Sequence, residues 1–138
     1  MFWSINPYNG QTLKTFIEMS GEELDGAIAT AHERFPSWRR LPFLDRGALL
    51  RQAARLCRER REDLARTMTL EMGKRIVEAR KEVDLCARIF DYYAEHGEHF
   101  LRPQKIQSPA GDATLINEPL KVTRSTTASA TFLLEEAR

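Results

Sequence analysis

Cysteine is scarce in this sequence, with only Cys57 and Cys86 among 138 residues. Secreted disulfide-rich domains use more cysteines in shorter chains, so we exclude that class and expect two reduced thiols. Long hydrophobic runs are missing as well, because no apolar stretch approaches the ~20 residues that span a bilayer. The first residues show no basic segment followed by an apolar run, as a signal peptide would. We therefore expect a cytoplasmic protein that does not associate with membranes.

An excess of charge of one sign is also lacking. The 21 Lys and Arg nearly balance the 20 Asp and Glu, which leaves a formal net charge of +1. Nucleic-acid-binding domains usually have a strong basic excess, and disordered chains combine high net charge with low hydrophobicity. Neither class fits, because 42% of the residues are hydrophobic. The composition favours one globular domain of ordinary size.

The first predicted element is a β-hairpin that joins Phe2–Ile5 to Leu13–Ile17. Asn9 and Gly10 favour a type I′ turn between the two strands, because both residue types tolerate positive φ. Pro7 restricts the first strand to an edge position or a short piece. A second hairpin is predicted further along the chain and is treated below.

Three amphipathic helices are predicted after the first hairpin. Ser20 and Glu23 form a predicted capping box at the start of the first helix, and Pro36 is expected to end it. Trp38 is expected to fill the corner before the second helix. Apolar residues recur at helical spacing along the first helix and indicate one buried face. This face comprises Leu24, Ala27, Ile28, Ala31 and Phe35.

The second helix is predicted to begin at the N-cap Asp45 and to end at Gly73, in the position that favours a left-handed backbone. The third is predicted from about Arg75 to His96, with Gly97 marking its end. Its buried face comprises Ile76, Ala79, Val83, Cys86, Ala87, Phe90, Tyr93 and Ala94. The opposite face of the second helix interleaves Arg and Glu over residues 55–62, which predicts a solvated, salt-bridged surface.

A second hairpin is predicted over Gln104–Ser108 and Ala113–Asn117, with a turn between them. The predicted fold class is therefore an α+β unit of three amphipathic helices flanked by two β-hairpins. An isolated hairpin is at best marginally stable in water. We therefore expect these hairpins to join a sheet whose other strands lie elsewhere.

The order and spacing of these segments resemble the aldehyde dehydrogenase superfamily over about Ser4–Leu120, and are most similar to its succinate-semialdehyde dehydrogenase branch. The matching pieces are Ile5-Asn6-Pro7 with Asn9-Gly10, Ser20–Ile28, Phe35–Arg39, Arg46 with Leu49-Leu50, Leu64–Lys74, Glu78–Asp84, Tyr92–His96 and Asn117–Leu120. The resemblance implies that the chain is an N-terminal fragment of the α/β aldehyde dehydrogenase fold. It places residues 1–120 in that domain and residues 121–138 in a divergent tail.

The family oxidises an aldehyde to a carboxylic acid with NAD or NADP. A cysteine thiolate attacks the aldehyde, an oxyanion site stabilises the product of that attack, and a glutamate activates water. In the family these residues lie beyond the region that this chain resembles. After Leu120 the family's Pro-Trp-Asn-Phe-Pro motif is absent from the sequence, as are the catalytic cysteine, the glutamate and the glycine-containing cofactor turn. The resemblance thus implies an inactive chain that binds no cofactor by itself.

We assign no catalytic, cofactor-binding or metal-binding residue to this chain. Cys57 and Cys86 lie on apolar helix faces, so we expect both to pack in the core. His96 and His99 have the spacing of metal ligands on a helix, but Gly97 and the lack of a third ligand favour a solvated helix end. Some members of the family bind a structural cation through an aspartate at the position of Asp84, which we expect to be hydrogen-bonded here.

Three functions stay open at this stage. The first is an enzyme part that needs the rest of a dehydrogenase chain to act on a small aldehyde. The second is a non-catalytic interaction module whose hairpin edges dock on full-length dehydrogenase subunits. The third, a helical nucleic-acid binder using Arg55–Arg61, is disfavoured by the near-zero net charge.

Overall fold

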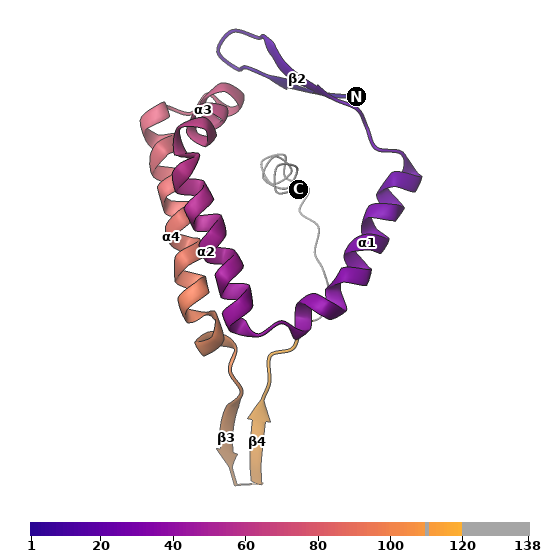
Figure 1. The fold of residues 1–138 in the computed structure, drawn as a ribbon, viewed down its shortest axis with the longest axis vertical. Coiled ribbons are helices and arrows are strands. Elements are labelled where there is room, and N and C mark those ends of the chain that lie inside the picture. Colours follow the sequence, from indigo (N-terminus) through magenta and orange to yellow (C-terminus); the bar gives the residue numbers. More distant parts are fainter. Residues whose placement is uncertain (110, 120–138) are drawn as a thin grey trace.

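The computed structural model describes residues 1–109 and 111–119. Four helices lie between two antiparallel hairpins (Figure 1). The elements are β1 (Phe2–Ile5), β2 (Thr12–Phe16), α1 (Gly21–Arg40), α2 (Phe43–Glu59), α3 (Arg61–Met72), α4 (Ile76–Leu101), β3 (Gln104–Ser108) and β4 (Gly111–Leu115). The predicted hairpins and helical middle are therefore confirmed, but there are four helices in place of three.

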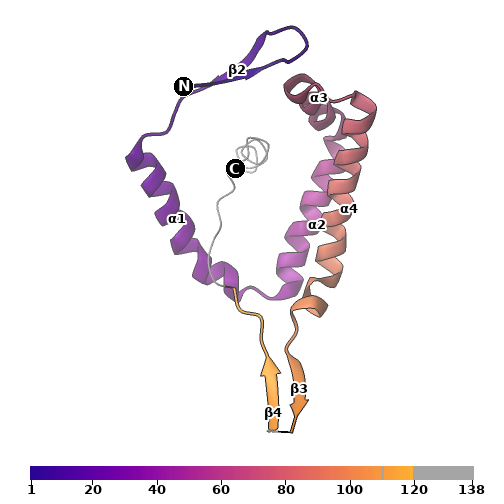
Figure 2. The ribbon, with the colours of Figure 1, turned by 180° about the vertical axis from the view of Figure 1, so that it is seen from behind.

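Helices α2, α3 and α4 pack together in one layer, and α1 stands apart from them in both views (Figures 1 and 2). The β1–β2 hairpin lies near α3, and the β3–β4 hairpin extends from the opposite end of the layer. Helix α1 connects the first hairpin to the start of α2 at the other end. Antiparallel packing of α2 against α4 therefore forms the centre of the described structure.

The predicted second helix is divided at Arg60, so the prediction of one continuous helix was wrong. Arg60 leaves helical geometry at φ −100° and ψ 19°, and its N–H group donates to the carbonyls of Leu56 and Arg58. Its own carbonyl then accepts from Leu64 and starts α3. No proline or glycine marks this break in the sequence. The break gives α3 its own direction, in which it packs against α4.

The start of α1 was predicted correctly and its end was not. The Ser20 hydroxyl accepts from the Glu23 N–H at 3.2 Å, and the Glu23 carboxylate accepts from the Ser20 N–H at 2.7 Å, which completes the capping box. Pro36 lies inside the helix and does not end it. Near the proline, the Ser37 hydroxyl donates to the Arg34 carbonyl at 2.7 Å. The helix continues to Arg40.

The core is a seam of small apolar side chains between the helices. Its buried members are Ala54, Cys57, Ala65, Ala79, Val83 and Ala87, with Leu64, Met68, Ile76 and Phe90 packed against them. Gly47 brings α2 close to α4, since a Cβ atom there would lie 2.9 Å from the Ala94 carbonyl oxygen. Small residues permit this approach, and any larger side chain at Gly47 would have to move the backbone of α4.

Two helix boundaries also differ from prediction. The N-cap of α2 is Pro42, and Asp45 lies in the first helical turn. Asp45 still suits this turn, because a carboxylate there faces the positive end of the helix dipole. Helix α4 continues through Gly97 to Leu101, where the prediction ended it near His96. A glycine lowers helix stability but does not by itself end a helix.

The turn of the first hairpin is not type I′. A type I′ turn needs a positive φ at both Asn9 and Gly10. Gly10 has a φ of 72°, but Asn9 does not have a positive φ, because every positive φ among the described residues belongs to a glycine. The Asn6 N–H donates to Gln11 and the Gly10 N–H donates to Asn6, which closes a longer loop. The Asn9 side chain accepts from the Gln11 N–H at 3.1 Å, so this asparagine supports the loop through its side chain. In the second hairpin, pairing runs to Ser108 and Gly111, so β4 begins two residues earlier than predicted.

Candidate functional site

The two cysteines occupy different environments. Cys57 is buried in the α2–α4 seam, as predicted, and this burial raises the pKa of its thiol. Cys86 is exposed, so the prediction that it packs in the core was wrong. It precedes the buried Ala87 on α4 and lies at the edge of the seam. A raised thiol pKa disfavours the thiolate, which is the nucleophilic form, so Cys57 is suited to packing and not to catalysis.

The two histidines of α4 lie in an aromatic cluster. The His96 ring is 4.6 Å from the Tyr92 ring and 6.2 Å from Phe100, and His99 is 5.9 Å from Phe100, measured between centroids. These separations are typical of packed aromatic side chains. Within residues 1–109 and 111–119, no group of three or more potential ligands could hold a metal ion.

The charged faces of α2, α3 and α4 form a network of ion pairs. Arg58 contacts Asp91 at 2.5 Å, Arg61 contacts Asp84, and Arg80 contacts Glu62 at 2.7 Å. The salt-bridged surface predicted from the interleaved Arg and Glu is therefore confirmed. Each of these exposed pairs joins α2 or α3 to α4, and exposed pairs of this kind add little stability individually.

Asp84 is held by two hydrogen bonds from one guanidinium. Arg61 donates from Nε to Oδ1 at 2.8 Å and from its terminal nitrogen to Oδ2 at 3.0 Å. These bonds lower the pKa of Asp84 and raise the pKa of Arg61. Hydrogen bonds from Arg80 likewise lower the pKa of Glu62. Asp84 is thus hydrogen-bonded, as predicted.

The segment around Gly73 joins the first hairpin to the helical layer. Gly73 has φ 68° and caps α3, as predicted, and a Cβ atom there would lie 3.1 Å from Pro7 Cγ. The Ser4 hydroxyl donates to the Glu71 carboxylate at 2.7 Å. Lys74 forms an ion pair with Glu82. This segment is therefore a structural junction.

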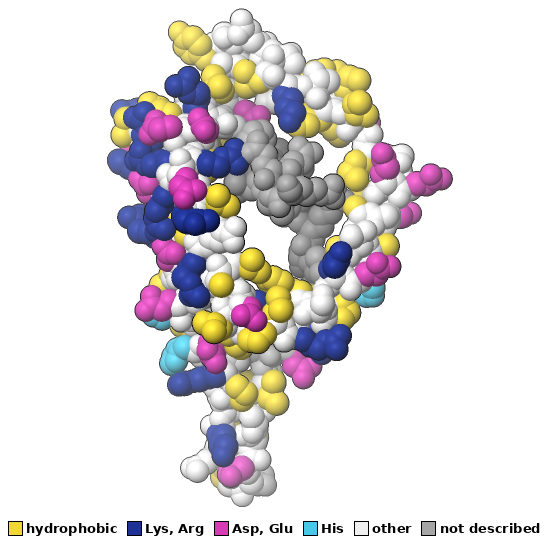
Figure 3. All heavy atoms as spheres, in the orientation of Figure 1, with side chains coloured by type: hydrophobic (Ala, Val, Ile, Leu, Met, Phe, Trp, Pro, Cys, Tyr) yellow, Lys and Arg dark blue, Asp and Glu magenta, His cyan; other side chains and the backbone are white. Residues whose placement is uncertain are grey.

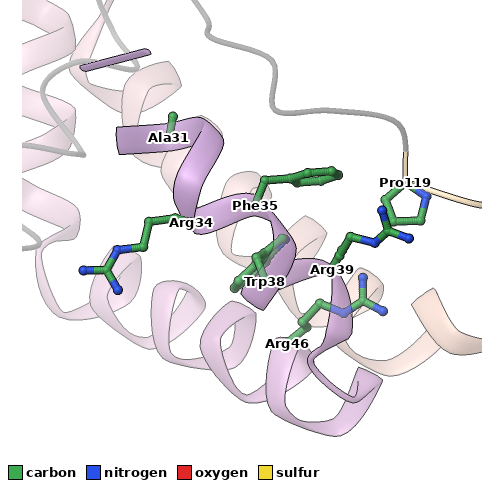
Figure 4. Close-up of a pocket in the computed structure, with 7 residues that line it drawn as sticks. All are labelled: Ala31, Arg34, Phe35, Trp38, Arg39, Arg46 and Pro119. Atoms are coloured by element: carbon green, nitrogen blue, oxygen red, sulfur yellow. The ribbon is translucent and has the colours of Figure 1, made fainter. Parts of the chain in front are cut away.

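The concavity shown in Figure 4 lies between the carboxyl-terminal half of α1 and the start of α2, and has a volume of about 490 Å³. Its apolar lining comes from Ala31, Phe35, Trp38 and Pro119, and its charged lining from Arg34, Arg39 and Arg46. We call this surface the arginine groove. Trp38 is 46% exposed here, so the expectation that it fills a corner between helices was wrong.

Arg46 is the most constrained side chain of the arginine groove. Its guanidinium carbon lies 4.2 Å from the centre of the Phe43 ring, in cation–π geometry. Its Nε atom is buried and has no hydrogen-bond partner within the described part of the chain. Leaving a buried donor unpaired costs about 1–3 kcal/mol, more for a charged group, so a partner for this atom would add stability.

Large apolar side chains are exposed along α1 and on both hairpins. Helix α1 has no buried residue, and its predicted buried face includes Leu24 at 40% and Ile28 at 52% exposure. Trp3 on β1 and Ile106 on β3 are about half exposed. Figure 3 shows hydrophobic side chains in yellow along α1 and the first hairpin. Isolated exposed apolar residues are ordinary, but contiguous apolar faces indicate contact with other protein. None of the described helices is long and apolar enough to span a membrane.

The described residues do not fit a dinucleotide cofactor. Such cofactors bind at the carboxyl ends of parallel strands, where a glycine-rich turn leads into a helix. Both described sheets are two-stranded and antiparallel. Helix α1 follows a strand but begins at a capping box, in which the Ser20 hydroxyl accepts from the Glu23 N–H and the Glu23 carboxylate accepts from the Ser20 N–H. No step of dinucleotide chemistry can therefore be assigned to these residues.

Comparison with known proteins defines the class of this chain. The model of the aldehyde dehydrogenase family matches residues 1–128, so the chain belongs to the aldehyde dehydrogenase family. Within it the chain is close to succinate-semialdehyde dehydrogenases. It is 42% identical over 121 residues to the NADP⁺-dependent succinate-semialdehyde dehydrogenase of Deinococcus radiodurans, an alignment that covers 88% of this chain and 25% of that protein.

Solved structures support the same placement. The succinic semialdehyde dehydrogenase of Streptococcus pyogenes, solved with NADP⁺, matches with a TM-score of 0.79 and 36% identity, over 84% of this chain and 26% of that one. The betaine aldehyde dehydrogenase of Staphylococcus aureus, solved with NAD⁺, matches with a TM-score of 0.70 and 33% identity, over 78% and 22% of the two chains. The chain therefore spans about a quarter of the length of the relatives that it matches.

The arginine groove was not predicted from the sequence. Phe35 and Trp38 were expected to be packing residues, and Arg39 and Arg46 were noted only as parts of the family resemblance. Its arginines come from two helices that are separated by the turn at Leu41 and Pro42, so no spacing within one helix brings them together. The one local signal was the run of Arg and aromatic residues around Pro36.

Proposed function

We propose that residues 1–138 form the amino-terminal part of a cytoplasmic, NADP- or NAD-dependent aldehyde dehydrogenase that oxidises succinate semialdehyde or a similar aldehyde to its carboxylic acid. The observation that carries this proposal is the 42% identity with the Deinococcus radiodurans enzyme over 88% of the chain. The named relatives support NADP⁺ as the first cofactor to test.

The proposed contribution of this part is structural and not chemical. We propose that residues 1–120 belong to the dehydrogenase domain and that residues 121–138 are a divergent tail, which lies outside the described residues. The buried Cys57 has a raised thiol pKa, and neither cysteine lies in a motif that the family uses for catalysis. The chain alone is therefore expected to be inactive, because activity needs a nucleophile and a cofactor site that these residues do not supply.

Activity can be tested with two proteins that share residues 1–119. The 138-residue chain and a chimera, in which residues 1–119 replace the corresponding segment of the Deinococcus radiodurans enzyme, are assayed with succinate semialdehyde and NADP⁺. We expect NADPH formation only with the chimera, at a rate close to that of the parent enzyme. NADPH formation by the 138-residue chain would contradict the inactive part of the proposal. A folded but inactive chimera would contradict the assignment to this enzyme class.

A second candidate function is a non-catalytic module that docks on full-length dehydrogenase subunits. Two observations favour it, the unpaired outer edges of two-stranded sheets and the exposed apolar faces of α1. Tagged chain and untagged Deinococcus radiodurans enzyme are co-expressed and purified through the tag. Recovery of the enzyme in fixed proportion would support docking. A chain recovered alone would rule this function out for that subunit.

A further inference from the structure

The arginine groove has an unusual balance of charge and apolar surface. Three arginines line the groove together with Phe35 and Trp38, and none of the lining residues is acidic. Figure 4 shows Arg39 and Arg46 on the side of the Phe35 ring, while Arg34 extends to the other side. Arg34 and Arg39 form no ion pair with any described residue, and the buried Nε of Arg46 has no partner among them. A groove of this kind is complementary to an apolar segment that bears a carboxylate.

The position of α1 points to where this segment comes from. Helix α1 buries none of its residues, so contacts within the described chain do not determine its orientation relative to α2 and α4. The Streptococcus pyogenes structure nevertheless contains a closely similar arrangement, with a TM-score of 0.79, and 26% of that chain is covered by the match. About three-quarters of that chain therefore lies outside the matched part and is available to contact α1 and the groove.

We propose that the arginine groove is the docking site for an acidic, apolar segment in the remaining three-quarters of an aldehyde dehydrogenase chain. A carboxylate of that segment accepts hydrogen bonds from Arg39 and Arg46, and its apolar side chains cover Phe35 and Trp38. The inference rests on the proposed function, because it takes the partner from the same family. It adds the surface and the chemistry through which the two parts recognise each other.

The groove is tested by co-expression in trans. The tagged 138-residue chain is produced together with the Deinococcus radiodurans enzyme lacking its first quarter, and soluble material is purified through the tag. The test variant is Arg39→Glu with Arg46→Glu. The matched control is Arg66→Glu with Arg88→Glu, which makes the same charge change at exposed positions on α3 and α4.

We expect the unmodified chain and the control variant to recover the truncated enzyme in about equal proportion, and the Arg39/Arg46 variant to recover at least tenfold less. Circular dichroism of each variant shows whether the helices are retained. Should the charge reversal lose its helices, Arg39→Gln with Arg46→Gln replaces it and the same loss is expected. Equal recovery by the folded groove variant, or no recovery by the unmodified chain, would overturn the proposal.

Two further readouts separate the possible occupants and the proposed function. Sedimentation of the chain alone tests for a second copy of this chain, and a dimer lost on charge reversal would overturn the proposed partner. A chain that lacks residues 120–138 tests whether the tail occupies the groove. If this shortened chain recovers more truncated enzyme than the unmodified chain does, the tail is the occupant, and the proposed partner is overturned. Recovery without NADPH formation would leave the groove proposal standing while it contradicts the proposed enzyme activity.

Discussion

Gly73 shows how one residue can fix a junction between two elements. Its φ of 68° ends α3, and the space beside its Cα is occupied by Pro7 of the first hairpin. Both constraints disfavour a side chain at this position, the first through backbone strain and the second through a tight contact with Pro7. The glycine therefore sets the direction of the chain and the approach of the hairpin together.

Substitution of Gly73 by Ala is expected to lower the free energy of unfolding by roughly 1–2 kcal/mol, which is the usual cost of a left-handed backbone for an L-residue. The matched control is Gly97→Ala, because Gly97 is inside α4 with nothing within 4 Å of an added Cβ. That control is expected to gain about 0.5–1 kcal/mol in helix stability. Urea unfolding, monitored by circular dichroism, gives the free energy of unfolding of both variants. A Gly73→Ala variant with an unchanged free energy of unfolding would contradict the strained geometry.

Asp84 gives a prediction about acid stability. Arg61 lowers the pKa of this carboxyl in the folded protein, so the folded value lies below the unfolded value of about 3.9. A lowered folded pKa contributes stability that is present above the unfolded pKa and is lost as the pH falls through the folded pKa. We therefore expect Asp84→Asn to melt at a lower temperature than the unmodified chain at pH 7.

The difference in melting temperature should narrow as the pH falls below about 4, where the unmodified chain loses the same interaction. Glu59→Gln is the control, because Glu59 pairs with Arg55 within one exposed helix face. Melting is followed by circular dichroism from pH 7 to pH 3. A difference that stays constant over this range would show that the effect of Asp84→Asn does not come from its charge.

At the scale of elements, α1 differs from the other helices. Helices α2, α3 and α4 share a buried seam, while α1 depends on its own hydrogen bonds and its capping box. A 20-residue helix without a packed face is only marginally stable in water. We expect the amides of α1 to exchange with solvent much faster than those of α4.

Removal of the cap by Ser20→Ala is expected to cost α1 about 1 kcal/mol, which accelerates its amide exchange about fivefold and leaves α4 unchanged. The control is Thr30→Ala in the middle of the same helix, where alanine has the higher helix propensity and should slow exchange. Hydrogen exchange followed by mass spectrometry measures each helix separately. Faster amide exchange in α4, or no change in α1, upon Ser20→Ala would contradict this separation.

The elements also show which features follow from the sequence. The capping box at Ser20 and the left-handed Gly73 depend on a few adjacent residues, and both were predicted. The break at Arg60 has no such local cause, because it accompanies the packing of α3 against α4. The continuation of α1 through Pro36 was not predicted either, because a proline inside a helix can kink it without ending it. The arginine groove joins two helices, so its geometry needed the structure. The family resemblance, in contrast, came from many short matches in order and needed no geometry.

At the scale of the whole molecule, exposed apolar surface determines how the chain behaves alone. Large apolar side chains on α1 and both hairpins remain between about 40% and 60% exposed, including Leu24, Trp3 and Ile106. Surfaces of this kind associate with other apolar surfaces or with hydrophobic dyes. The chain without a partner should therefore self-associate.

We expect the 138-residue chain to enhance the fluorescence of anilinonaphthalene sulfonate and to form oligomers whose size grows with concentration. Ile28→Glu, in the apolar face of α1, should reduce both effects. Thr30→Glu adds the same charge at another exposed position of α1 and serves as the control. Sedimentation velocity gives the size distribution. A monomer that binds no dye at tens of micromolar would show that these faces are covered within the chain.

The contiguity of the α2–α3–α4 layer has a consequence for synthesis on the ribosome. The layer is made from the uninterrupted stretch Phe43–Leu101, and its contacts join helices that are neighbours or near neighbours in the chain. Local contacts form early and quickly. At translation rates of about 5–20 residues per second, this stretch is made in roughly 3–12 s. The layer can thus assemble while the polypeptide is still growing, whereas α1, although it is made first, contributes no buried residue to it.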